Sequence, residues 1–331
     1  MKELVVISGK GGTGKTSLIA SFAALAKPAV VADCDVDAAD LHLVLGPQIK
    51  RREDFVGGSK ARINAELCMA HGQCRELCRF GAIELDGPAN ERVPQTCRIE
   101  PLACEGCGVC VDHCPKHAIA FEPVVCGQWF ISQTRCGPMV HAQLGVAAEN
   151  SGKLVTHLRR TAQQLAAEYQ LELILCDGSP GIGCPVIASL TAASLALFVV
   201  EPTVSGVHDF RRVAELARQL GVPGMLAVNK ADLNDAMAAQ LEALARQFGM
   251  SVAGRVPYDP AVTRAQVARR AVVEVSDGPA AAAIRRVWAE VSQCLQASSP
   301  AGSGDVVPLT GWTDHEKISQ NPSPGMNNLA H

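Results

Sequence analysis

The chain has 331 residues, of which 48% are hydrophobic and 19% are charged, and its formal net charge is −3. This composition supplies a large core and excludes wholesale disorder, while the near-neutral charge disfavours a strongly basic nucleic-acid-binding protein. No uninterrupted run of about 18 apolar residues is present, so no transmembrane helix is expected. The first residues lack the layout of a signal peptide. We therefore expect a cytoplasmic protein that binds neither nucleic acid nor membranes.

Strand-like and helical segments alternate over most of the chain. A buried strand at 4–7 precedes a glycine-rich loop and a helix at 16–26, and a second buried strand follows at 29–32. Further strands are expected at 171–176, 195–200, 225–228 and 251–256, and further helices at 153–169, 207–220, 235–248 and 280–295. Apolar strands that alternate with amphipathic helices predict a doubly wound, mostly parallel α/β sheet.

The middle of the chain has a different texture. Gly57-Gly58-Ser59 indicates a break, and the residues that follow form short segments with many cysteines and little periodicity. We therefore expect a sheet domain split into 1–58 and 123–297, with an inserted domain at 59–122. The polar residues 298–331, rich in Pro, Gly and Ser, predict a disordered tail.

A phosphate-binding loop lies between the first strand and the first helix. The pattern G-x-x-x-x-G-K-[ST] is met by Gly9, Lys10, Gly11, Gly12, Thr13, Gly14, Lys15 and Thr16, with Ser17 next. Glycines allow successive backbone N–H groups to point at phosphate oxygens, and the N-terminus of the following helix adds its dipole. Lys15 is expected to reach the β- and γ-phosphates, and the Thr16 hydroxyl is expected to bind Mg²⁺.

This loop resembles the deviant Walker A loop of the MinD/ParA/nitrogenase-iron-protein ATPases. The resemblance implies that Lys10 crosses a homodimer interface and contacts the nucleotide bound by the partner subunit. Residues 33–41 resemble switch I of that family, which implies that Asp35 positions or activates the attacking water. Residues 173–181 resemble Walker B and switch II, so Asp177, at a strand end, is expected to hold Mg²⁺ through water. Lys10, Lys15 and Asp35 are the expected catalytic residues.

Asn229-Lys230-Ala231-Asp232 resembles the base-reading loop of the same ATPases. It also matches the guanine signature of GTPases, in which an aspartate accepts hydrogen bonds from guanine N1–H and N2–H. The family resemblance favours ATP over GTP, with Asn229 and Asp232 as cofactor-binding residues.

The cysteines form the second functional pattern. The chain has 14 cysteines, eight of them between Cys68 and Cys114, and clustered cysteines in a cytosolic chain bind metal or do redox chemistry more often than they form disulfides. The bacterial ferredoxin pattern C-x₂-C-x₂-C-x₃-C-P is met by Cys104, Cys107, Cys110, Cys114 and Pro115. Structural zinc is the alternative, but zinc ligands usually come as two separated pairs, which favours a [4Fe–4S] cluster.

A second copy of the motif lies 36 residues upstream, where Cys68, Cys74 and Cys78 keep the spacing but His71 replaces the second cysteine. In two-cluster ferredoxins the fourth cysteine of each motif ligates the other cluster. The expected ligand sets are therefore Cys104, Cys107, Cys110 and Cys78 for one cluster, and Cys68, His71, Cys74 and Cys114 for the other. The second set leaves three alternatives open, which are a Cys₃His [4Fe–4S] cluster, a [3Fe–4S] cluster with His71 unused, or no cluster. Cys97 fits no ligand spacing.

The two patterns together resemble the MinD-superfamily P-loop ATPases that contain an inserted ferredoxin domain. The leading expectation is MgATP hydrolysis coupled to electron transfer through [4Fe–4S] clusters to a redox partner. An ATP-dependent iron–sulfur carrier that serves an apo-protein client is the alternative. A MinD- or ParA-like positioning ATPase ranks third, because the tail from Ser298 is neither a membrane-binding amphipathic helix nor a basic face.

Overall fold

A computed structural model describes residues 1–26, 28–145 and 151–297, so the tail expected at 298–331 lies outside the described residues. Nine strands form one sheet in the order β11-β10-β9-β1-β8-β2-β7-β6-β3. Neighbours from β11 to β7 are parallel, whereas β6 runs antiparallel to both β7 and β3. The strands are β1 (Lys2–Ser8), β2 (Val30–Cys34), β3 (Gln48–Ile63), β6 (Ile119–Thr134), β7 (Gly137–Leu144), β8 (Leu173–Pro180), β9 (Leu195–Val200), β10 (Gly224–Asn229) and β11 (Ser251–Val256).

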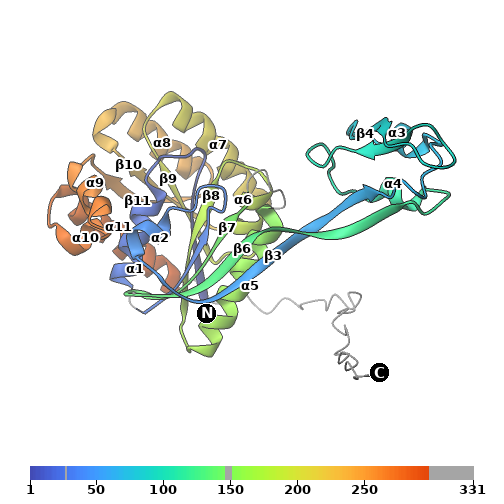
Figure 1. The fold of residues 1–331 in the computed structure, drawn as a ribbon. Helices are drawn as coiled ribbons and strands as arrows, with labels where there is room; N and C mark the ends of the chain where they lie inside the picture. The colour runs from blue at the N-terminus through green and yellow to red at the C-terminus, as the bar shows by residue number, and fades with distance from the viewer. Residues whose placement is uncertain (27, 146–150, 298–331) are drawn as a thin grey trace, which may run out of the picture.

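Helices cover both faces of this sheet (Figure 1). One layer consists of α5 (Ser151–Glu168), α6 (Cys184–Leu190), α7 (Val204–Gln219) and α8 (Asp235–Gln247), with the short η1 (Ala231–Leu233). The other layer consists of α1 (Lys15–Leu25), α2 (Leu41–Leu45), α9 (Pro260–Val267), α10 (Val272–Val275) and α11 (Pro279–Ala297). None of the helices in the described ranges has the length and apolar character needed to span a membrane.

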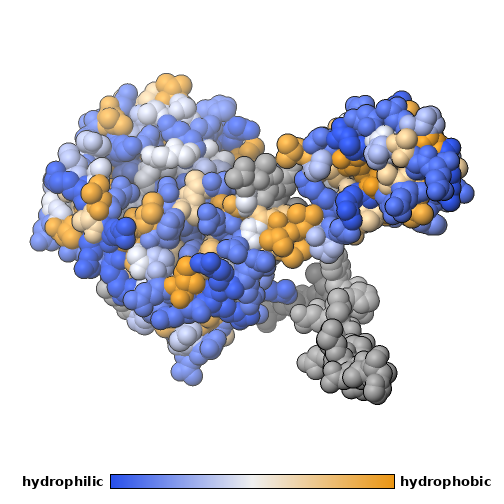
Figure 2. Space-filling view, viewed as in Figure 1, coloured by the Kyte–Doolittle hydropathy of each residue, from blue (hydrophilic) through white to orange (hydrophobic). Residues whose placement is uncertain are grey.

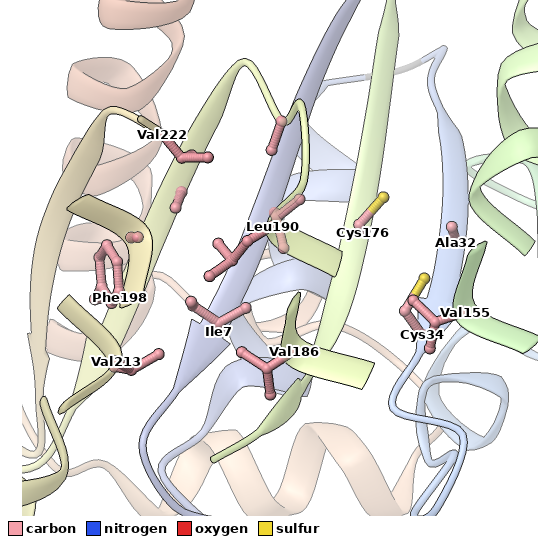
Figure 3. Close-up of a cluster of buried hydrophobic side chains, with 14 of the residues drawn as sticks. Ile7, Ala32, Cys34, Val155, Cys176, Val186, Leu190, Phe198, Val213 and Val222 are labelled. Carbon is pink, nitrogen blue, oxygen red and sulfur yellow. The ribbon is translucent and has the colours of Figure 1, made fainter. Parts of the chain in front are cut away.

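The central strand β1 shows why the sheet needs two helical layers. Val5 and Ile7 are fully buried on one face, and Leu4 and Val6 are fully buried on the other. Figure 3 shows part of the first core, where Ile7 lies among apolar side chains that include Val186. A strand that is apolar on both faces is stable when helices cover both. The expected doubly wound, mostly parallel α/β sheet is confirmed.

The last two strands of the sheet extend beyond it as a ribbon that leads to the inserted segment (Figure 1). β3 and β6 have 16 residues each and pair from Gln48 with Gln133 to Ile63 with Ile119. The break expected at 57–59 is wrong, because β3 continues through it. The register shifts on both sides of Val56, and glycines are typical of such a bulge in a strand. The expected domain boundaries at 58/59 and 122/123 fall inside this ribbon.

The base of the ribbon is tied to the helices beside it. Arg135, in the turn between β6 and β7, donates hydrogen bonds to the carbonyl oxygens of Val44 (3.1 Å) and Leu45 (2.9 Å) at the end of α2. Its guanidinium also forms an ion pair with Glu274 at 2.5 Å, which lowers the pKa of Glu274 to about 2. The ribbon is therefore anchored to α2, which directly follows residues 33–40.

Residues 61–121, called the cysteine lobe below, form a separate small body at the far end of the ribbon (Figure 2). The lobe contains α3 (Gln73–Leu77), β4 (Ile83–Gly87), β5 (Thr96–Ile99) and α4 (Val109–Asp112). Its backbone repeats after 36 residues. Three pairs of left-handed residues show this repeat: Ala70 and Gly106, Gly72 and Gly108, and Gly81 and His117.

The two halves of the cysteine lobe exchange backbone hydrogen bonds. The N–H of Asn64 donates to the carbonyl oxygen of Ala118 at 2.7 Å, and the N–H of Glu100 donates to that of Ala82 at 2.8 Å. Asn64 and Glu100 are 36 residues apart, as are Ala82 and Ala118. The halves are therefore related by a pseudo-two-fold axis, and each half begins beside the end of the other.

Candidate functional site

The carboxyl ends of β1 and β2 border a cleft of about 610 Å³. The phosphate-binding loop lies at this edge, between β1 and α1. Gly14 has a φ of 92°, and a Cβ atom there would lie 2.3 Å from Nδ2 of Asn229, so both the conformation and the space require glycine. The same amide donates a hydrogen bond to the carbonyl oxygen of Thr13 at 2.7 Å. The end of β10 therefore holds the loop in place before any ligand arrives.

The predicted nucleotide-binding residues divide between the cleft wall and the layer behind it. Those that line the cleft are Gly11, Gly12, Gly14, Lys15, Thr16, Ser17, Asp35 and Asn229. Those outside the lining are Gly9, Lys10, Thr13, Asp177 and Asp232. Thr13 and Asp177 are almost completely buried, whereas Gly9 packs against Asp209.

Charged and unpaired polar atoms gather at the floor of the cleft. Nζ of Lys15 lies 3.5 Å from Oδ2 of Asp35, and both side chains are buried. Oγ1 of Thr13, Oδ1 of Asp35 and both carboxylate oxygens of Asp177 are buried without a hydrogen-bond partner. Burial raises the pKa of Asp177 to about 7, and Lys15 opposes this shift. Because unpaired buried oxygens cost free energy, these atoms fit a site that is completed by a cation and a phosphate.

Asp33 is a site residue to which sequence patterns alone assign no role. Its carboxylate is fully buried at the end of β2 and accepts the backbone N–H groups of Asp35 and Leu41, each at 3.3 Å. Burial, followed by the charges of Asp177 and Asp35, raises its pKa well above the usual range. Asp33 therefore fixes the backbone around Asp35. The sequence feature that could have indicated this role is the position of Asp33 at the end of a buried strand, two residues before Asp35.

Lys10 contacts its own chain. Its Nζ atom lies 3.3 Å from Oγ of Ser205 and 3.4 Å from Oε2 of Glu201, and its side chain is 33% exposed. Glu201 also pairs with Lys230 at 2.5 Å. Glu201 and Ser205 follow the end of β9, so they neutralise and hold Lys10 beside the phosphate-binding loop in the single chain.

The loop expected to read the base uses its aspartate for a contact within the chain. Oδ1 of Asp232 accepts the backbone N–H of Tyr258 at 2.6 Å. Pro257 and Tyr258 line the cleft, whereas Asp232 stands behind them. Asp232 therefore orders the neighbouring wall of the cleft.

The cysteine lobe contains two clefts, and each of them gathers side chains from both halves. One cleft is lined by Cys78, Cys104, Cys107 and Cys110. The other is lined by Cys68, His71, Cys74, Cys97 and Cys114. Cys78 and Cys114, the last cysteines of their motifs, each lie with the first three positions of the other motif. Their Sγ atoms accept the backbone N–H groups of Ala82 and Ala118, both at 3.4 Å.

No group of three or more His, Cys, Asp or Glu side chains within residues 1–26, 28–145 and 151–297 is placed so that it could hold a metal ion. Cys97, for which the motif spacing predicts no ligand role, is buried and lines the cleft of the first motif, together with Cys68 and His71. To predict from the sequence that Cys97 lies in this cleft, the two halves would have had to be aligned with their 36-residue offset.

A family model described as the CobQ/CobB/MinD/ParA nucleotide binding domain matches residues 4–272 of this chain. The chain belongs to this family. It is 31% identical to the uncharacterised protein MJ0578 of Methanocaldococcus jannaschii, over 70% of this chain and 79% of that protein. It is 24% identical to the uncharacterised ATP-binding protein MJ0547 of the same organism, over 87% of this chain and 86% of that protein.

Among solved structures, the septum site-determining protein MinD of Pyrococcus horikoshii, complexed with Mg-ADP, superposes with a TM-score of 0.53. The match covers 90% of this chain and 98% of that chain at 15% identity, and it shows the fold of the family. None of these three relatives is named for iron, sulfur or electron transfer. The MinD/ParA-like ATPase, which the sequence ranked third, is the function class that the comparisons favour.

Proposed function

We propose that the protein hydrolyses MgATP as a nucleotide-bridged homodimer of the MinD/ParA type. The observation that carries this proposal is the floor of the cleft, where Lys15 and Thr16 meet Asp35 and the unpaired carboxylate of Asp177. The loop N–H groups would bind the phosphates, and the oxygens of Thr16 and Asp177 would hold Mg²⁺ directly or through water.

The geometry of Lys15 and Asp35 links nucleotide binding to catalysis. These two side chains pair with each other at 3.5 Å in the single chain. When a γ-phosphate takes over Lys15, Asp35 is released to orient a water molecule and accept its proton. The water oxygen then forms a bond to the γ-phosphorus as the bond to the bridging oxygen of ADP breaks, which yields ADP and phosphate. Asp33 holds the backbone of Asp35 during this exchange.

The dimer proposal rests on Lys10. In the single chain its ammonium group is occupied by Glu201 and Ser205 at the edge of the phosphate-binding loop. In the dimer it would leave these partners and contact the nucleotide of the other subunit. Adenine is preferred over guanine in this proposal, because the Asp232 carboxylate already accepts the Tyr258 N–H behind the cleft wall.

Phosphate release and light scattering test this proposal with wild-type protein, Lys10→Ala and the matched control Lys50→Ala, whose side chain is exposed on β3. We expect MgATP hydrolysis that exceeds MgGTP hydrolysis, and an ATP-dependent dimer in wild type and control. Lys10→Ala should stay monomeric with ATP. Absence of hydrolysis in the wild type, or an ATP-dependent dimer of Lys10→Ala, would contradict the proposal.

We further propose that residues 59–122 form a ferredoxin-like domain with two iron–sulfur clusters. The support is the crossed arrangement of cysteines in the two clefts and the N–H groups directed at Cys78 and Cys114. A [4Fe–4S] cube is larger than one ion, so its ligands surround a cube and need not converge on a single point. When bound, such clusters supply one-electron transfer.

In this proposal a reduced iron–sulfur or flavin protein gives one electron to the domain, which passes it to a one-electron acceptor. ATP hydrolysis would couple to this transfer through the ribbon, which starts just after switch I. An anaerobic redox titration with low-temperature EPR, with and without MgATP, tests the coupling. We expect iron and sulfide in equal amounts and a potential that shifts with MgATP. Zinc in place of iron would contradict the cluster proposal, and transfer of iron to an apo-protein at unshifted potential would favour the carrier alternative.

A further inference from the structure

The cleft of the first motif contains one more candidate ligand than a [4Fe–4S] cluster needs. A [4Fe–4S] cluster with one ligand on each iron needs four, and five side chains that could bind iron line this cleft: Cys68, His71, Cys74, Cys97 and Cys114. The spacing of the motif selects His71. The structure allows His71 and Cys97 to be compared directly, because the cleft of the second motif shows which positions hold its four cysteines.

The pseudo-two-fold axis identifies the equivalent of Cys97. With the 36-residue offset, Cys97 in β5 corresponds to Ala61 in β3. Ala61 lines the cleft of the second motif, and Cys97 lines the cleft of the first. The cleft of the second motif, which holds four motif cysteines, therefore has Ala61 at this position. The cleft of the first motif, where His71 replaces one motif cysteine, has Cys97 at the equivalent position. Each cleft consequently holds four thiols.

Cys97 is placed among the other ligands. Its side chain is 3% exposed, and it lines the same cleft as Cys68 and Cys74. His71 is exposed, as is Cys107 at the equivalent position, so exposure alone does not decide between the candidates.

We propose that Cys97, and not His71, is the fourth ligand in the cleft of the first motif, so that both clusters are held by four thiolates. Soft thiolate ligands favour iron–sulfur clusters more than imidazole does. The first ligand set becomes Cys68, Cys74, Cys97 and Cys114, and His71 lies at the rim. This inference rests on the proposed iron–sulfur function.

Iron and sulfide counting on the full chain, reconstituted anaerobically, tests the inference. Two [4Fe–4S] clusters correspond to about eight irons per chain. We expect about eight in wild type and in His71→Ala, and about four in Cys97→Ala and Cys97→Ser. Cys97→Ala copies the alanine that the other half already carries, and Cys136→Ala, at a buried cysteine of the sheet domain, is the matched control with about eight. EPR spin counting provides a second readout for each variant.

The outcomes separate the two proposals. About eight irons in Cys97→Ala would overturn the assignment of Cys97, whatever the content of His71→Ala. About four irons in His71→Ala with eight in Cys97→Ala would assign the ligand to His71. A wild-type protein that takes up no iron would overturn the iron–sulfur function and this inference with it.

Discussion

The nucleotide cleft and the cysteine lobe build their sites in opposite ways. The phosphate-binding loop of the nucleotide cleft is one run of residues, Gly9–Thr16, and β10 fixes the loop through Asn229. Each cleft of the lobe takes its cysteines from both halves, about 36 residues apart. A contiguous motif predicts its own site, whereas a site shared between symmetric halves also depends on residues outside the motif, such as Cys97.

The two regions also differ in what holds them together without ligands. The sheet domain has two extensive buried cores, one on each face. The buried core of the lobe consists of only seven residues, two of which are cysteines: Ala61, Cys68, Ile83, Cys97, Ile99, Ala118 and Ile119. So small a core rarely stabilises a domain by itself. The fold of the lobe should therefore depend on the proposed iron–sulfur clusters, and the fold of the sheet domain should not depend on a nucleotide.

The largest expected effect follows from removal of the proposed iron–sulfur clusters. Structural metal sites contribute on the order of 10 kcal/mol to the folding of small domains, so anaerobic chelation of iron should unfold residues 61–121. Hydrogen exchange measured by mass spectrometry should show lost protection in β4 and β5 and unchanged protection in β1 and β9. Equal protection of the lobe before and after chelation would show that the lobe folds without metal.

Lys15→Ala should greatly slow ATP hydrolysis in the nucleotide cleft and leave the iron content of the lobe unchanged. Loss of one preorganised donor to transition-state charge typically costs about 10²–10³-fold in kcat. Phosphate release under saturating MgATP measures the loss, and iron content measured on the same sample should equal that of wild type. Full activity of this variant would show that Lys15 is not required for ATP hydrolysis.

Mg²⁺ binding should depend on pH through Asp177. The pKa of this carboxyl is raised to about 7 by burial, and the charged form binds the cation, so affinity falls as the pH drops. With this pKa the ionised fraction changes about tenfold between pH 6 and pH 8. Calorimetry of Mg²⁺-dependent ADP binding should show that difference. Asp177→Asn should bind weakly and keep only the pH dependence that the nucleotide's own phosphates impose on both proteins.

The smallest expected effect concerns His71. If Cys97 completes the cluster, His71→Cys adds an unused thiol at the rim, and both reduction potentials should stay within error of the wild-type values. Exchange of a ligating imidazole for thiolate would instead lower one potential, because histidine ligation raises it. A redox titration monitored by EPR distinguishes the two results.

The parts of the molecule that the sequence predicted well have short-range causes. The apolar run at 4–7 and the glycine pattern that follows it determine a strand, a turn and a helix within about 20 residues, and the structure has all three there. The grouping of Cys78 with the second motif follows from the ferredoxin spacing. In each case the residues that determine the feature are adjacent or separated by a fixed step.

The ribbon escaped prediction because its stability comes from the partner strand. Residues 50–54 of β3 are all charged and show no alternation of polar and apolar side chains. Two of their neighbours on β6 are aromatic, and the guanidinium groups of Arg51 and Arg52 lie over the rings of Trp129 and Phe130 at 5.7 and 5.4 Å. Cation–π contacts of this kind stabilise a pair of strands, but they join residues that are about 80 positions apart.

The length of the ribbon beyond the sheet determines how far a small rotation at its base would move the cysteine lobe. Half of β6, Gly127–Thr134, is paired with β7 in the sheet, and Arg135 ties this end to α2. The other half, residues 119–126, pairs with β3 alone and reaches roughly 26 Å at about 3.3 Å per residue. A rotation of about 5° at the edge of the sheet would therefore move the cysteine lobe through roughly 2 Å.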